Sequence, residues 1–352
     1  MRLIPKEDLI EILNFSKQDI LKLNSASIFL TGATGLFGTW FLSAIQFANE
    51  NLNIDIKVTC LTRNKLKFSK SFPQLYSDKN FKFFNGDITS FDYPQGEFTH
   101  LIHFAATNAQ ETFDGASPRS KFDMIIDGSR RVIEFCKIKK IKKILFTSSG
   151  AVYGHDDSSS KNQFIEDLNF APALSDISTA LGQSKRAAEF LFQLHAHETK
   201  SSLTIMRCFS FVGPVLPLDI HYAIGNFIGN AIQGKSLRII GDGTPIRSYM
   251  YMSDLITWLI RLLVNQASID VINVGSDEKV NIKELAEKII KVTNSKSNID
   301  ILGLREHSVG NPVKDIYVPN IEKAKTKYNL GVKVRLSESI KKTFMYNKNL
   351  SN

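Results

Sequence analysis

Short apolar runs alternate with longer amphipathic segments from residue 25 onward, and this alternation restricts the possible folds more than any other feature of the chain. The runs are SIFLTG, IKVTCLT, FKFFNGD, HLIHFAA, KKILFTSS and LTIMRCFS, in this order along the sequence. Strands joined by helical crossovers run parallel, and a parallel sheet is covered by helices on both faces. The sequence therefore predicts an α/β fold built on a doubly wound parallel sheet.

A second, smaller lobe is predicted beyond Arg207, where two prolines interrupt the alternation. Short surface helices are expected at 282–293 and 320–329, whereas VINVGS at 271–276 still resembles a strand followed by a loop. The second lobe is therefore expected to be partly interleaved with the first. We divide the chain into an N-terminal helical extension (1–24), a large domain (25–208, with 250–276 returning to it) and a smaller lobe (209–249 and 277–352).

The N-terminal extension is expected to brace the large domain. Residues 4–23 predict an amphipathic helix with Leu9, Ile10, Leu13 and Ile20 on one side. Acidic residues stand where a signal peptide has its apolar stretch, and the longest apolar segment, 255–264, falls short of the ~20 residues of a membrane span. We expect neither secretion nor a membrane partner.

Composition limits the partners and the compartment. The 44 Lys+Arg against 35 Asp+Glu give a net charge of +9, which suggests an anionic ligand. The lysine-rich run 137–143 lacks interleaved aromatic residues and indicates a solvated helix end rather than a nucleic-acid site. Cys60, Cys136 and Cys208 are an odd number without close pairs, which favours reduced core thiols in a cytoplasmic protein.

A glycine-rich motif, TGATGLFG at 31–38, lies directly between an apolar run and a helical stretch. Gly32 can make the tight turn, Gly35 lets backbone N–H groups approach a pyrophosphate, and Gly38 allows the helix to pack closely on the sheet. Strand, glycines and helix in this order predict a dinucleotide-binding sheet of the Rossmann type. Thr34, Leu36 and Phe37 of the same turn are expected beside the cofactor.

The end of the second run bears on the choice between NAD and NADP. An NAD site usually has an acid there to hold the ribose hydroxyls, but this chain has Thr62, Arg63 and Asn64. Arg63 can pair with a 2′-phosphate, which favours NADP, while NAD held through hydroxyl contacts beside a solvent-facing Arg63 stays open. Asp87, after the third run, either accepts a hydrogen bond from the adenine amino group or caps the strand end.

Seven motifs together resemble one enzyme family. TGATGLFG, NGDI, LIHFAA, TSSGAVYG, LGQSKRAAE, GDGTPIRSYMYMSDL and NVGS, in this order and spacing over roughly residues 25–345, are similar to the extended short-chain dehydrogenase/reductases, specifically the nucleotide-sugar epimerase/dehydratase family. The resemblance implies that the large domain binds a nicotinamide dinucleotide and the small lobe a nucleoside-diphosphate sugar. It implies further cofactor contacts at Ile88, Ala105, Ala106 and Thr107.

The resemblance also implies the catalytic positions, and one of them is altered. Members of this family oxidise a sugar hydroxyl by passing hydride to the cofactor while a Tyr removes the proton, a Lys four residues later assists, and a Ser or Thr orients the hydroxyl. Ser149 matches the Ser and Lys185 the Lys, but Leu181 stands at the Tyr position. Either another group is the base, with Lys185, Tyr153 and His155 as candidates, or the enzyme is impaired, or the reaction uses other acid–base groups.

The residues after Ser149 help to choose the reaction. Dehydratases of the family carry an Asp-Glu pair there, because eliminating the C6 hydroxyl needs an acid and a base. This chain has Gly150 and Ala151, neither of which moves protons. The pattern favours a redox-neutral C4 epimerase, with a 4,6-dehydratase, a 4-ketoreductase and a non-enzymatic dinucleotide sensor as alternatives.

The small lobe offers fewer predictions. By resemblance, Arg247 meets the substrate diphosphate and Asn226 helps to hold the nucleotide, while Ser210 replaces the Asn of many relatives. No metal site is expected, because His195 and His197 point to different faces of a helix. Segments 117–136 and 181–199 match those that form homodimers in this family.

Overall fold

In the part of the chain that the computed structural model describes, residues 3–105, 115–154, 163–168, 170–220, 223–265, 268–303 and 316–351, seven parallel strands form the central sheet. Their order is β11-β6-β5-β4-β1-β2-β3. The strands are β1 (Ser27–Thr31), β2 (Lys57–Thr62), β3 (Phe81–Asn85), β4 (His100–His103), β5 (Lys143–Ser149), β6 (Ser202–Cys208) and β11 (Ile269–Val274). The predicted doubly wound parallel sheet is confirmed. Its topological switch point, where ligands bind in such folds, lies between β1 and β4.

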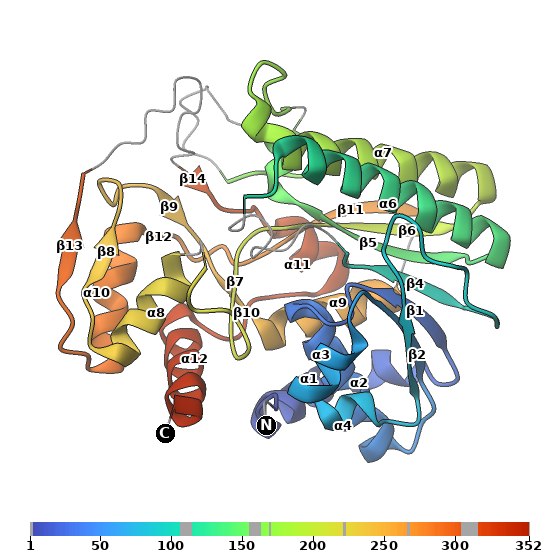
Figure 1. Cartoon of the computed structure of the whole chain (residues 1–352), viewed down its shortest axis with the longest axis horizontal. Helices are drawn as coiled ribbons and strands as arrows, with labels where there is room; N and C mark the ends of the chain where they lie inside the picture. Colours follow the sequence, from blue (N-terminus) through green and yellow to red (C-terminus); the bar gives the residue numbers. More distant parts are fainter. Residues whose placement is uncertain are drawn as a thin grey trace.

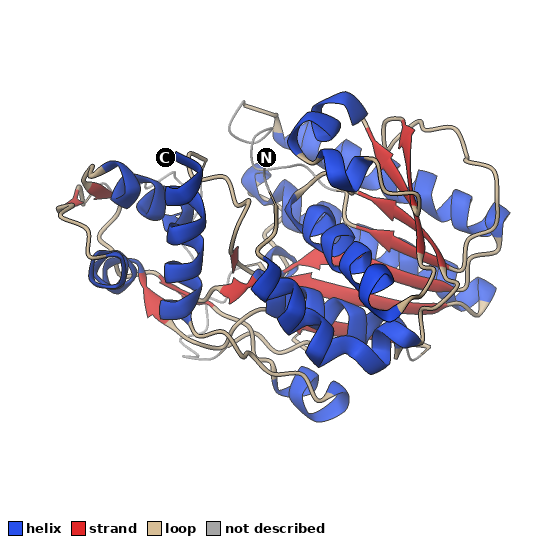
Figure 2. Ribbon diagram, turned by 90° about the horizontal axis from the view of Figure 1, so that it is seen from below, coloured by secondary structure: helices blue, strands red, loops and turns tan. Residues whose placement is uncertain are grey.

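Helices cover both faces of this sheet (Figures 1 and 2). The helices α6 (Pro118–Lys139) and α7 (Ala180–Thr199) pack on one face, and α2 (Leu36–Leu52) and α9 (Met252–Val264) on the other. The core under α6 and α7 is aromatic, with the rings of Phe29 and Phe135 4.5 Å apart and those of Phe146 and Phe192 4.6 Å apart. The inner strands β1, β4, β5 and β6 are predominantly apolar because both faces of the sheet are covered there, whereas the edge strand β3 is partly exposed.

Two short helices, α3 (Lys65–Ser71) and α4 (Pro73–Tyr76), connect β2 to β3. After β6 the chain leaves the central sheet, and it returns with α9, which packs on the sheet, and with β11, the strand beside β6. Outside the central sheet the chain forms β7 (Phe211–Val212), α8 (Ala223–Gln233), β8 (Leu237–Ile239), β9 (Ile246–Arg247), β10 (Met250–Tyr251), β12 (Val280–Asn281), α10 (Ile282–Thr293), β13 (Ile299–Ile301), β14 (Ile316–Tyr317) and α12 (Leu336–Ser351), while α11 (Glu322–Tyr328) packs against β11. The helix predicted over 282–293 is confirmed as α10, which begins with a capping box between Asn281 and Glu284.

The N-terminal helix α1 (Lys6–Leu21) packs on α9 and α2, but its buried face differs from the predicted one. Asp8 is fully buried, whereas Ile10 is 41% exposed. Asp8 accepts hydrogen bonds from Tyr251 at 2.8 Å and from Lys342 of α12 at 2.6 Å. The predicted apolar side was wrong at Ile10, and the helix instead buries Asp8, whose carboxyl group is satisfied by hydrogen bonds from residues distant in sequence.

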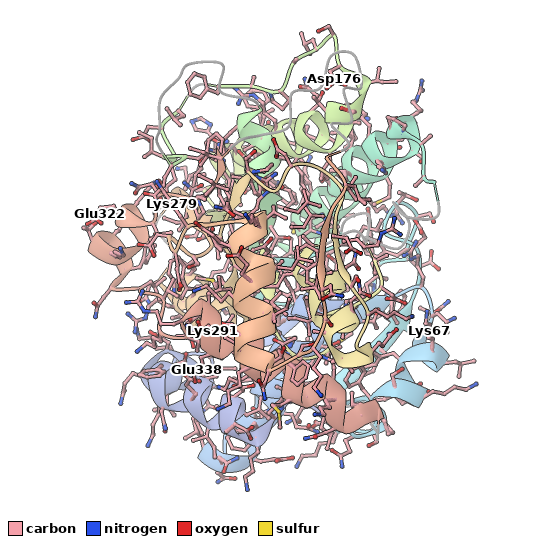
Figure 3. All side chains as sticks on the ribbon, turned by 90° about the vertical axis from the view of Figure 1, so that its left-hand side faces the viewer. Lys67, Asp176, Lys279, Lys291, Glu322 and Glu338 are labelled. Atoms are coloured by element: carbon pink, nitrogen blue, oxygen red, sulfur yellow. The ribbon has the colours of Figure 1, made fainter. Side chains whose placement is uncertain are left out.

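Charged side chains are spread over both lobes. Figure 3 shows Lys67, Lys279, Lys291, Glu322 and Glu338 pointing outward from the surface, and all five are exposed. Among the described helices, none combines the length and apolar character required to cross a bilayer.

Candidate active site

The glycine-rich turn joins β1 to α2 at the carboxyl edge of the sheet. Gly32 has φ +70°, and a Cβ on it would lie 2.8 Å from the Ala105 backbone nitrogen, so this turn requires glycine. A Cβ on Gly38 would lie 2.3 Å from the Ala33 carbonyl oxygen, so α2 packs directly on the turn. A Cβ on Gly35 would meet only the Gly32 oxygen, at 3.4 Å. The space beside Gly35 is therefore open to a ligand.

The start of α2 fits an anion. Gly35 is its N-cap and is exposed, as is Thr34, and the first turn contains no acidic residue. Free backbone N–H groups at a helix N-terminus bind phosphate well. Leu36 and Phe37 are half-buried, and the Phe37 ring packs 5.0 Å from that of Phe211, so their side chains face the protein. The residues present fit the pyrophosphate of a dinucleotide.

Arg63 and Asp87 lie close together at the ends of β2 and β3. Burial raises the pKa of Asp87, but hydrogen bonds from Thr89 and the charge of Arg63 outweigh it, and the pKa falls below its usual value. The Asp87 Oδ1 accepts from the Thr89 backbone at 2.9 Å and from its hydroxyl at 2.7 Å, which is the strand-end cap considered above. Ile88 is buried against Gly128 of α6.

The end of β4 is fixed by a buried polar contact. Thr31 Oγ1 and His103 Nδ1 share a hydrogen bond of 2.7 Å, and the Ala105 backbone N–H donates to the same Thr31 oxygen at 3.2 Å. Burial, helped by the charge of Lys185, lowers the pKa of His103 to about 3, so this imidazole stays neutral and holds the strand ends together. Ala106 and Thr107, the other predicted contacts here, lie outside the described residues.

Ser149 and Lys185 meet the same end of β5. Ser149 is the last residue of β5, and its Oγ accepts from the Ala151 backbone at 3.1 Å, which starts the 3₁₀ turn η1 (Gly150–Tyr153). Lys185 is 3% exposed, and its Nζ donates to the Thr147 carbonyl oxygen at 2.7 Å. Burial lowers the pKa of Lys185 to about 8.

Leu181 lies one turn before Lys185 at the start of α7 and is 37% exposed. Its neighbour Gly182 packs against η1, since a Cβ on Gly182 would lie 2.5 Å from the Ala151 carbonyl oxygen. The fold therefore places position 181 beside the segment that follows Ser149. The side chain there is aliphatic and cannot exchange protons.

Tyr153 does not provide the missing phenol. It is 1% exposed, its hydroxyl donates to Asn273 Oδ1 at 2.7 Å, and the guanidinium of Arg207 lies 4.8 Å from its ring centroid. Burial raises its pKa to about 12. Tyr153 is a packed aromatic residue that ties η1 to β11, and His155 lies outside the described residues.

The predicted substrate residues lie on separate elements of the smaller lobe and its junction. Arg247 is in β9, between β12 and β14, and its Nη1 donates to the Ile246 carbonyl oxygen at 2.8 Å. With its amide nitrogen facing the preceding loop, Asn226 donates to the carbonyl oxygens of residues 218 and 220, both at 3.0 Å, so it braces that loop. Ser210 follows β6 and is half-buried, and its carbonyl oxygen accepts from the Met250 backbone at 2.9 Å.

One residue at this site was missed by the sequence analysis. Tyr317 of β14 reaches the large domain, where its phenol oxygen lies 2.8 Å from the place that a Cβ on Gly150 would take. Tyr317 belongs to none of the motifs that pointed to a function. The absence of a side chain at Gly150 is the one feature of the sequence that relates to Tyr317, and it is recognised only once the fold brings the two residues together.

Comparison with known proteins agrees with this geometry. The sequence model of the NAD dependent epimerase/dehydratase family matches residues 28–275, more than half of the chain. A solved UDP-glucuronic acid 4-epimerase from Bacillus cereus, in complex with UDP-glucuronic acid and NAD, has the same fold, with a TM-score of 0.78 at 24% identity, over 92% of this chain and 99% of that one.

Two curated relatives show the range of reactions near this sequence. A UDP-glucuronate 4-epimerase from Thermodesulfobacterium geofontis is 26% identical over 85% of this chain and 87% of its own length. A dTDP-D-glucose 4,6-dehydratase from Dictyostelium discoideum is 26% identical over 76% of this chain, which spans 62% of that relative's length. With the family match, the glycine turn, and Ser149 and Lys185 at one strand end, the chain belongs to the NAD dependent epimerase/dehydratase family.

Proposed function

We propose that the protein is a nucleotide-sugar C4 epimerase that works by transient oxidation of the sugar. The observation that supports this most directly is the pair Gly150 and Ala151, which follows Ser149 without a carboxylate. Elimination across C5 and C6 needs an additional acid and base at the sugar. Inversion through a 4-keto sugar needs only the one group that moves the hydroxyl proton. A redox-neutral reaction therefore suits these residues best.

The residues divide the work between binding and chemistry. The bound nicotinamide dinucleotide supplies a hydride acceptor that later returns the hydride. Backbone N–H groups in the first turn of α2, directly after Gly35, hold its pyrophosphate, and Lys185, fixed by Thr147, orients the ribose next to the nicotinamide. Ser149 hydrogen-bonds the sugar hydroxyl, and Arg247 binds the diphosphate through its planar guanidinium.

Product analysis tests the reaction. Purified protein is incubated separately with UDP-, GDP-, CDP- and dTDP-linked hexoses and hexuronic acids, and products are identified by NMR. We expect one nucleotide sugar to equilibrate with its C4 epimer, with C6 retained and no net change in cofactor. A 4-keto-6-deoxy product, a reduced sugar without back-reaction, or loss of carbon dioxide would contradict the proposal.

The alternative of a different class is a dinucleotide sensor, which the aliphatic Leu181 favours. The two are separated by adding nucleotide sugars to protein loaded with oxidised cofactor. An epimerase forms a detectable fraction of dihydronicotinamide, seen by its absorbance, while a sensor binds the dinucleotide and remains silent with every sugar.

We further propose that Arg63 gives the site a preference for NADP over NAD. A guanidinium at the end of β2 suits a 2′-phosphate, and a charged hydrogen bond contributes about 1.5–3 kcal/mol. We expect Arg63→Ala to weaken NADP binding about tenfold or more and NAD binding less than about threefold. Isothermal titration measures both affinities, with Lys67→Ala as the control for loss of a nearby exposed cation. Equal losses for both dinucleotides would refute a role for Arg63.

The proposed enzyme is a cytoplasmic homodimer. Phe190 and Leu194 lie one turn apart on α7 and are 62% and 44% exposed, and Ile138 on α6 is 52% exposed. Since α6 and α7 pack together, these side chains suit a second copy of the same helix pair. Cys60, Cys136 and Cys208 are buried free thiols, which suits a reducing compartment.

A further inference from the structure

Tyr317 reaches from the smaller lobe to the backbone directly after Ser149. In the parallel pair of β14 with β9, Tyr317 is opposite Arg247, so the two side chains leave the same face of this small sheet. The Tyr317 phenol oxygen lies 2.8 Å from the position of a Cβ built on Gly150. A phenol therefore stands beside the catalytic serine position, although none stands at Leu181.

Position 150 has a chemical meaning in the family that this chain resembles. Its dehydratases carry an Asp-Glu pair directly after the Ser, so the resemblance implies that position 150 lies beside the sugar. In this chain the Tyr317 hydroxyl and the edge of the Phe209 ring occupy the place of that side chain. A side chain at position 150 is incompatible with this phenol and equally with the Phe209 ring, whose Cε1 and Cζ would also lie 2.8 Å from that Cβ. Gly150 therefore makes room for both aromatic side chains.

The phenol is held in place from both sides. The Tyr317 ring packs 4.7 Å from that of Phe209 and 6.4 Å from that of Phe164. The next residues form backbone hydrogen bonds with Phe164, one from its N–H to the Val318 oxygen at 3.0 Å and one from the Asn320 N–H to its oxygen at 2.8 Å. A hydroxyl that the fold already holds in place loses little further entropy when it is oriented for proton transfer.

We propose that Tyr317 is the catalytic acid–base of this enzyme and exchanges the proton of the reacting sugar hydroxyl in place of the tyrosine absent at position 181. The inference rests on the proposed function. As the carbon-bound hydrogen leaves as hydride for the nicotinamide, which is the oxidant, the Tyr317 phenolate accepts the hydroxyl proton and the C=O bond forms. When the hydride returns to the other face of the carbonyl, the phenol gives the proton back, so atoms and electrons balance.

Three variants test this role. Tyr317→Phe keeps the ring and its packing and removes only the hydroxyl, and we expect it to lower kcat by about 10²–10⁴-fold, as loss of a positioned acid–base does. The double variant Tyr317→Phe with Leu181→Tyr should recover at least about tenfold of that loss, because it restores a phenol at the family's usual position. Tyr76→Phe, which removes the hydroxyl of a half-buried tyrosine on α4, should match the wild type.

Two further readouts separate chemistry from structure. The affinity of Tyr317→Phe for the nucleotide sugar and the dinucleotide should stay within about threefold of the wild type, so the loss appears in kcat rather than KM. In protein labelled at its tyrosine rings, the NMR signal of Tyr317 is the one that is absent from the spectrum of Tyr317→Phe. We expect this signal to shift when the nucleotide sugar binds, and this readout does not depend on turnover.

The outcomes distinguish this inference from the proposed function. If the wild type converts a nucleotide sugar and Tyr317→Phe is equally fast, or if the tyrosine signal does not respond to the sugar, Tyr317 is not the acid–base. If the wild type converts no nucleotide sugar, the proposed function fails and this role fails with it.

Discussion

Gly35→Val should leave the protein folded and abolish dinucleotide binding. Gly35 has φ −81° and ψ −177°, an extended backbone that valine adopts readily. A Cβ there meets only the Gly32 oxygen at 3.4 Å, so the protein itself accepts a side chain. The valine methyl groups instead fill the space beside the α2 N-terminus that the pyrophosphate needs. Loss of two charged hydrogen bonds costs about 3–6 kcal/mol, which raises the Kd at least about 100-fold.

Gly38→Ala is the informative contrast, because the two glycines differ in what surrounds them. A Cβ on Gly38 falls 2.3 Å from the Ala33 carbonyl oxygen, a backbone atom that cannot turn aside. Overpacking of this kind typically costs about 1–3 kcal/mol, so this variant should unfold at lower urea concentration. Urea unfolding and dinucleotide titration are measured for both variants. A Gly35→Val protein that binds the dinucleotide normally would show that the turn is structural only.

The sheet and the glycine turn were predictable because their signals are local. The inner strands β1, β4, β5 and β6 are mostly buried and read as apolar runs, and even the partly exposed edge strand β3 keeps three phenylalanines, so the sheet is apparent in the sequence. The roles of Gly32 and Gly38 follow from their places between a strand and a helix, and the positive φ and the close contacts agree with them.

The remaining features depend on partners far away in sequence. Ile10 was placed on the buried side of α1, but the buried position is Asp8, whose partners Tyr251 and Lys342 come from the other end of the chain. Tyr153 was one of three candidates for the base because of its motif, yet its hydroxyl is held by Asn273 on β11. Tyr317 could not be found, since the register of β14 brings it to the site. No local pattern encodes such pairings.

Lys185→Met should inactivate the enzyme and stabilise its fold. The ammonium of Lys185 is buried, and its pKa falls to about 8 from the usual 10.5 because burial disfavours the charge. This pKa difference means that the buried charge destabilises the folded state by about 3 kcal/mol. Methionine fills similar space without charge, and losing the charged hydrogen bond to Thr147 offsets about 1.5–3 kcal/mol, which leaves a net gain of up to about 1.5 kcal/mol. Turnover should fall at least ~100-fold as the ribose loses its anchor.

The pH dependence of this gain has a definite sign. Below pH 8 the lysine is protonated in both the folded and the unfolded chain, so the folded wild type carries the full cost of the buried charge. Between pH 8 and 10.5 the folded lysine loses its proton while the unfolded one keeps it, and the cost disappears. The stability advantage of Lys185→Met should therefore be largest below pH 8 and shrink above it. The control Lys82→Met, at an exposed site on β3, should leave the free energy of unfolding nearly unchanged at any pH. Urea unfolding at pH ~6 and ~9.5 measures both gaps. A Lys185→Met protein less stable than the wild type at the lower pH would mean that the lysine is retained for the fold, and a gain in stability with loss of turnover would mean that it is retained for the reaction.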